Sequence, residues 1–173
     1  MTGATIARII AATQGSALRA VSAEDGRLVL HGPDPVPAVT VIVDRDTPTT
    51  VLGRVIVPLV PLLAPRPYRE EELCLALLIS GTLPGGRCIL GRLDDELVLQ
   101  ADVATGPERF PAAVVAQARF LQRQALHLAP AFALVGRGIS ARAALNSLDE
   151  QLETTAVLAA AQRILATTEH QHD

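Results

Sequence analysis

The chain is nearly free of aromatic residues and contains no lysine. Aromatic residues make up 2% of its 173 residues, Trp is absent, and the 15 basic residues are all Arg. A hydrophobic share of 49% excludes a disordered chain, because disordered chains bury too little apolar surface to fold. The core must therefore consist of Leu, Val, Ile and Ala. The length fits one domain with room for an appendage.

Concentrated charge and long hydrophobic runs are also missing. The formal net charge is −3 at pH 7, and the Arg residues are scattered along the chain. Direct binding to nucleic acid is disfavoured, because phosphate binding needs a concentration of positive charge. Pro58, Pro61 and Pro65 interrupt the best candidate for a membrane span, and the start of the chain lacks the pattern of an export signal. We expect no membrane association and a cytoplasmic location.

Residues that hold metals or form disulfides are few. Cys74 and Cys88 both stand in apolar contexts, so we expect two buried, reduced thiols, with a disulfide as the alternative. His127 lies beside the apolar face of a predicted helix, which favours packing. The tail at 169–173, Glu-His-Gln-His-Asp, could bind a divalent metal, but zinc sites need ligands on ordered structure. We therefore expect no metal and no cofactor.

No local pattern indicates catalysis. The acidic cluster at 94–96 fits an exposed hairpin turn, and the three glutamates at 70–72 fit the first turn of a helix, where the helix dipole favours negative charge. The glycine-rich segment 81–87 has the wrong spacing for a phosphate loop and precedes a strand. We expect no enzyme. An enzyme or small-molecule binder with residues that converge from distant segments remains an alternative.

A strand–turn–strand pattern occurs twice, each time between helical stretches. The first copy covers 17–30 with Asp25-Gly26 at its turn, and the second covers 86–99 with an acidic turn. The β-branched run 39–43 predicts a further strand, while 52–58 is ambiguous because Pro58 would end a strand or confine it to a sheet edge. Helices are predicted at 5–12, 70–79, about 108–129 and about 140–166.

The long helix has one apolar face and is predicted to kink or break at Pro130. Gly136 and Gly138 then form a hinge, and Ser140 can cap the last helix. On the long helix, Gln117, Gln122, Arg123 and Gln124 lie off the apolar face. That face carries Phe110, Val114, Ala118, Leu121, Ala125 and Leu128.

The stretch 77–90, which contains Leu-Pro-Gly-Gly-Arg at 83–87 and continues into 97–101, resembles the YbjN-like bacterial family. In this chain Cys88 stands where an aromatic residue is usual, and Asp94-Asp95 replaces Asp-Gly. The order of elements resembles the fold of class I type III secretion chaperones. The resemblance implies an α+β fold, α-βββ-α-ββ-α, with residues 1–136 as the domain and 139–168 as an extra C-terminal helix.

The resemblance also implies a non-enzymatic homodimer that binds another protein, because secretion chaperones of this shape wrap an extended segment of an effector. An alternative is an oligomeric scaffold that assembles through the C-terminal helix. For the strand residues the alternative role is core packing, and for the helix residues it is packing against their own domain. The candidate partner-binding or dimer residues are Val39, Val41, Val43, Val55, Val57, Leu145, Leu148 and Leu152.

Overall fold

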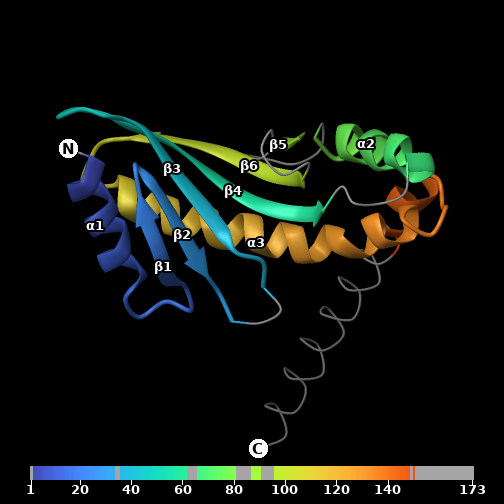
Figure 1. Cartoon of the computed structure of the whole chain (residues 1–173), viewed down its shortest axis with the longest axis horizontal. Helices are drawn as coiled ribbons and strands as arrows, with labels where there is room; N and C mark the ends of the chain where they lie inside the picture. Colours follow the sequence, from blue (N-terminus) through green and yellow to red (C-terminus); the bar gives the residue numbers. More distant parts are fainter. Residues whose placement is uncertain are drawn as a thin grey trace, which may run out of the picture.

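The computed structural model describes residues 2–33, 36–61, 66–80, 87–90, 96–148 and 150. These residues form a six-stranded antiparallel sheet with the strand order β1-β2-β3-β4-β6-β5, together with helices that pack against it. Figure 1 shows α3 running behind the strands along the length of the molecule. The elements are α1 (Thr2–Thr13), β1 (Arg19–Glu24), β2 (Arg27–His31), β3 (Val39–Asp46), β4 (Val51–Pro61), α2 (Arg66–Ser80), β5 (Arg87–Leu90), β6 (Glu96–Thr105) and α3 (Phe110–Val135).

The expected α+β class is confirmed, with one strand more than the sequence predicts before α2. This extra strand is β4, the segment that sequence patterns leave ambiguous, and it lies between β3 and β6. Pro58 does not end it. β3 pairs with β4 only as far as Ile56, so Pro58 lies where β4 has β6 as its partner and needs no hydrogen bond toward β3.

The first predicted hairpin is confirmed as β1 and β2. Asp25 has φ 44° and Gly26 has φ 80°, so both central residues of the turn are left-handed. Such a two-residue turn matches the right-handed twist of paired strands, and Asp and Gly tolerate these angles best. β1 is the edge strand, and all six of its residues are exposed.

α3 continues through Pro130 to Val135, so of the two outcomes predicted at Pro130, a kink or a break, the break is wrong. Pro130 lies on the exposed side of the helix, where water can replace the hydrogen bond that proline cannot donate. The prediction that Gln122 lies off the apolar face of this helix is also corrected. Gln122 is buried, and its Nε2 donates to the Pro37 carbonyl at 2.8 Å, which ties α3 to the loop before β3. All six residues predicted on the apolar face are buried.

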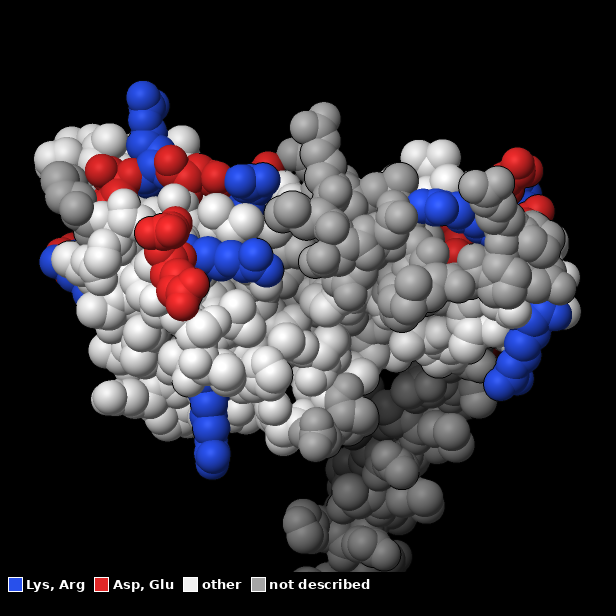
Figure 2. All heavy atoms as spheres, in the orientation of Figure 1, with Lys and Arg blue, Asp and Glu red and all other residues white. Residues whose placement is uncertain are grey.

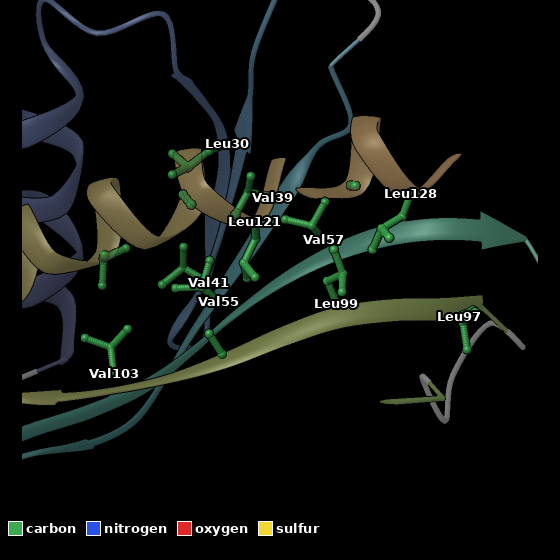
Figure 3. Packing of buried hydrophobic residues seen from close by; sticks show 14 of the residues in the cluster. Leu30, Val39, Val41, Val55, Val57, Leu97, Leu99, Val103, Leu121 and Leu128 are labelled. Atoms are coloured by element: carbon green, nitrogen blue, oxygen red, sulfur yellow. The ribbon is translucent and has the colours of Figure 1, made fainter. Parts of the chain in front are cut away.

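One face of the sheet, called the inner face from here on, packs against α1 and α3. Figure 3 shows side chains of β2, β3, β4 and β6 pointing toward Leu121 and Leu128 of α3. Successive residues of a strand point to opposite sides, so every second residue joins this core. The inner-face residues include Leu28, Leu30, Val39, Val41, Val43, Val51, Val55, Val57, Leu97, Leu99, Ala101 and Val103.

A close contact fixes the start of α3 over the sheet. Phe110 is completely buried, and its ring covers Gly53 of β4. A Cβ added at Gly53 would lie 2.7 Å from the Ile42 carbonyl oxygen and 2.8 Å from Phe110 Cζ. Only glycine leaves room for the ring at this position, because interiors are close-packed.

In the described ranges, no helix is long and apolar enough to cross a membrane.

We predict that Gly53→Ala destabilises the chain by about 2 kcal/mol, because the new methyl group overlaps a backbone oxygen and the Phe110 ring. The matched control is Gly3→Ala in α1, where a Cβ meets nothing within 4 Å. Alanine is the better helix former there, so the control should gain about 0.5–1 kcal/mol. Urea unfolding of both variants measures the two changes. Equal stability of Gly53→Ala and the native chain would contradict this packing.

Candidate partner-binding surfaces

The five valines predicted as partner-binding residues lie in the core. Val39, Val41, Val55 and Val57 are 0% exposed, and Val43 is 9% exposed. They point to the inner face, where α3 covers the sheet. Val39, Val41, Val55 and Val57 are out of a partner's reach in the folded chain, so core packing, the alternative, describes these four. Val43 joins the same core and also lines a groove described below. The residues next to these valines in each strand point to the opposite side of the sheet, and that side is the candidate surface.

The outer face of the sheet exposes an apolar row over β2, β3 and β4. Val29 pairs with Thr40, and Thr40 pairs with Ile56, so these three side chains form one row across three strands. All three are half-buried, and Ile42 extends the row along β3. A single exposed apolar residue is ordinary, but contiguous ones on a sheet face are typical of a binding surface.

Charged residues border this apolar row on one side. Arg54 pairs with Asp44 through two hydrogen bonds, Nε to Oδ2 at 2.9 Å and Nη2 to Oδ1 at 2.6 Å. The Asp44 hydrogen bond raises the pKa of Arg54, and the charges of Asp44 and Asp102 add to this effect. In Figure 2, blue and red spheres gather over the upper left of the molecule, and most of the described surface below them is white, with a single blue side chain at the lower edge. The border can orient a partner, since charge pairs contribute specificity.

A groove, the second candidate surface, lies between α1 and the β1–β2 turn. It is an open groove of about 620 Å³. Figure 1 shows α1 beside this hairpin at the N-terminal end of the molecule. α1 contributes Thr2, Gly3, Ile6, Ala7 and Ile10, the hairpin contributes residues 23–26, and β3 contributes Val43. Sequence patterns do not predict the groove, because it depends on the distance between two elements.

The glutamates of α2 do not form the solvated first turn that the sequence predicts. α2 begins at Arg66, so the glutamates lie further into the helix. Glu71 Oε2 accepts a hydrogen bond of 2.6 Å from the Ala141 amide, where the last helix begins. Glu72 is 2% exposed, and its Oε2 has no hydrogen-bond partner among the described residues. Burial raises the pKa of the Glu72 carboxyl, and the positive charge of Arg69 opposes this rise.

The solvent side of α2 carries apolar groups. Leu77 is 75% exposed, and Cys74, one turn earlier, is a free and exposed thiol. The prediction that Cys74 is buried is therefore wrong. The side chain of Cys88 lies outside the described residues. Leu77 is the most exposed large apolar side chain among the residues that the structure describes.

The first turns of the last helix pack against the chain's own domain. Residues 141–148 are helical, and Ser140 Oγ accepts from the Ala143 amide at 3.4 Å, as a capping residue does. Leu148 is 4% exposed and Leu145 is half-buried against the same core, which also includes Ala141 and Ala144. Leu152, with the rest of the predicted extension to 168, lies outside the described residues.

Groups that could do chemistry are sparse in the part of the chain that the structure describes. There, no three His, Cys, Asp or Glu side chains gather as a metal site would require. His127 is half-buried on α3, and its Nε2 is buried without a hydrogen-bond partner among these residues. The acidic cluster at 94–96 falls almost entirely outside the described residues, with Glu96 described in its backbone only. His170 and His172 also fall outside them.

Comparison with known proteins gives likenesses to solved structures only. No family model matches the chain, and no curated protein does. One solved structure that matches is the heterodimeric complex ExoU–SpcU from the type III secretion system of Pseudomonas aeruginosa. The matched chain has 18% sequence identity and a TM-score of 0.42, over 70% of this chain and 95% of that one. A TM-score this low carries no argument, so the α+β assignment rests on the chain's own sheet and helices.

We predict that Glu72→Gln stabilises the chain at pH 7.5. The folded chain binds the Glu72 proton more tightly than the unfolded chain, because its pKa is raised above the ordinary 4.5. Stability is therefore lost as the pH rises from about 4.5 through the raised pKa, and glutamine removes this loss. Thermal unfolding between pH 4.5 and 7.5 should show a melting-temperature gain of a few degrees at the upper end that vanishes at the lower end.

Glu70→Gln is the matched control, since Glu70 is exposed on the same helix. Its melting curve should run parallel to that of the native chain at every pH. A loss of stability in Glu72→Gln at pH 7.5 would mean that the ionised carboxylate is held by a favourable partner, and would contradict the account of its burial.

Proposed function

We propose that this chain is a non-enzymatic protein-binding module, chaperone-like or regulatory, that acts as a homodimer and binds a partner protein or an extended segment of one. The observation that carries the proposal is the apolar row of Val29, Thr40, Ile42 and Ile56 on the outer face of the sheet. The helices that line the core on β3, α1 and α3, lie on the inner face, and the side chains of the outer row keep part of their surface exposed, so a partner can contact them.

The chemistry of the row supports a macromolecular partner. Its side chains are apolar or carry a single hydroxyl group, and they lie in line across three neighbouring strands. A small molecule would keep much of its surface in water there, whereas a protein segment can cover several strands at once. The open edge of β1 adds unpaired backbone groups that can extend the sheet with a partner strand.

Self-association is supported by a different surface, the exposed side of α2. Leu77, 75% exposed, and the exposed Cys74 one turn earlier lie on the same side of α2, and burial of a leucine in a subunit interface would contribute about 1.5–3 kcal/mol. Because Leu77 and the outer row lie on different elements, a homodimer through α2 would leave the row free. The two parts of the proposal are therefore compatible.

An oligomeric scaffold that assembles through its C-terminal helix is the second candidate. Leu145 and Leu148 already pack against their own domain, so in this candidate only residues beyond 150 would join subunits. A chain that ends at Glu150 keeps Ala141, Ala144 and Leu148, the buried side chains that the structure describes in the last helix, and tests this candidate.

Affinity capture tests the outer row. The full-length native chain, Ile56→Glu and the control Ala104→Glu are immobilised and exposed to lysate of the native organism. Ala104 is exposed at the far end of the same face. We predict one dominant protein on the native chain and the control, reduced at least about tenfold on Ile56→Glu, because a buried carboxylate is costly at an interface. Equal capture by Ile56→Glu would contradict the outer-row site, and recovery of the chain alone would favour the scaffold.

Light scattering on purified protein tests the homodimer. We predict twice the chain mass of 18.2 kDa for the native protein and the single mass for Leu77→Glu. Leu126→Glu on α3 is the matched control, since Leu126 is also an exposed leucine, 42% exposed. The control should remain dimeric. A dimer that survives Leu77→Glu but is lost in the chain ending at Glu150 would instead support the scaffold.

A further inference from the structure

The groove between α1 and the β1–β2 turn differs in chemistry from the outer row. Its floor is apolar, formed by Ile6 and Ile10 of α1 and Val43 of β3. Its walls carry residues with little or no side chain, such as Gly3 and Ala7, which leave the space open. A volume of about 620 Å³ is enough for a large side chain of a bound segment.

Charge at the groove has one sign only. The charged residues that line it are Glu24 and Asp25, which are neighbours at the turn and both exposed. The turn holds them in place, because Asp25 and Gly26 have the left-handed angles of a tight hairpin. An apolar hollow with an acidic rim is complementary to an apolar side chain that stands next to a positive charge.

Backbone groups beside the groove can extend the contact. β1 ends at Glu24 on the groove's rim, and its outer edge pairs with no described strand. A segment anchored in the groove can therefore continue alongside β1. This favours a peptide over a small metabolite, since among the described residues that line the groove the polar side chains are those of Thr2, Glu24 and Asp25.

We propose that this groove binds a peptide segment of a partner protein through one large apolar side chain, with an Arg or Lys within two positions of it paired to Glu24 and Asp25. The inference rests on the proposed protein-binding function and names the chemistry of the segment. The apolar side chain supplies most of the affinity, and the basic residue supplies specificity, since exposed charge pairs contribute little energy of their own.

Gly3 offers a clean way to close the groove. A Cβ at Gly3 meets nothing within 4 Å, so the first carbon of a leucine side chain fits there, and leucine is the better helix former. Ala4→Leu is the matched control, since Ala4 is exposed on α1 and does not line the groove. Glu24→Gln with Asp25→Asn removes the acidic rim, and asparagine tolerates the left-handed angle of residue 25.

The test selects a displayed library of random 12-residue peptides on the immobilised full-length chain. We expect enriched peptides with a large apolar residue and an Arg or Lys within two positions. Their affinity should fall at least about tenfold on Gly3→Leu and stay unchanged on Ala4→Leu. Selection on the chain without the acidic rim should lose the preference for basic residues.

Two results would overturn the inference. Peptides that bind Gly3→Leu as well as the native chain would place their site elsewhere, and would leave the protein-binding proposal intact. Enriched peptides without basic residues would show that the acidic rim does not contribute to recognition. The absence of any enriched peptide would show that the groove does not bind peptides. The capture experiment with Ile56→Glu reads the outer row independently, so failure of the groove and failure of the proposed function are distinguishable.

Discussion

The packing of α3 across the inner face of the sheet determines the rest of the structure. With few aromatic residues, the chain builds this contact from aliphatic side chains and from the Phe110 ring over Gly53. The contact decides which side of each strand is buried, and so leaves Val29, Thr40, Ile42 and Ile56 on the outer face. Core packing and the candidate binding surface are therefore two results of the same arrangement.

Local patterns were sufficient where an element depends on its own residues. The Asp25-Gly26 turn, the strand that begins at Val39 and the apolar face of α3 are predicted by turn chemistry, β-branched runs and helical spacing. Residues 52–58 are different, because β4 pairs with β6 some forty residues later in the chain. A proline in such a segment is acceptable only where a neighbouring strand has ended, and the sequence does not show where that is.

The candidate site was harder to predict than the fold. Val39, Val41 and Val43 alternate with Thr40 and Ile42, and both sets are apolar enough to face either a helix or a partner. Only the position of α3 decides between them. The environment of Glu71 and Glu72 also depends on distant parts of the chain, although their sequence pattern fits an exposed helix start. Glu71 accepts its hydrogen bond from Ala141, seventy residues later in the chain, and Glu72 is buried.

Side-chain labelling by hydroxyl radicals tests the central claim, that partners bind the outer face of the sheet. The free chain is compared with the chain bound to the protein recovered by capture. The account predicts that Ile42 and Ile56 lose reactivity on binding, while the buried Val41 and Val55 are weakly labelled in both states. Unchanged labelling of Ile42 and Ile56 in the bound chain, with protection only in other segments, would contradict it.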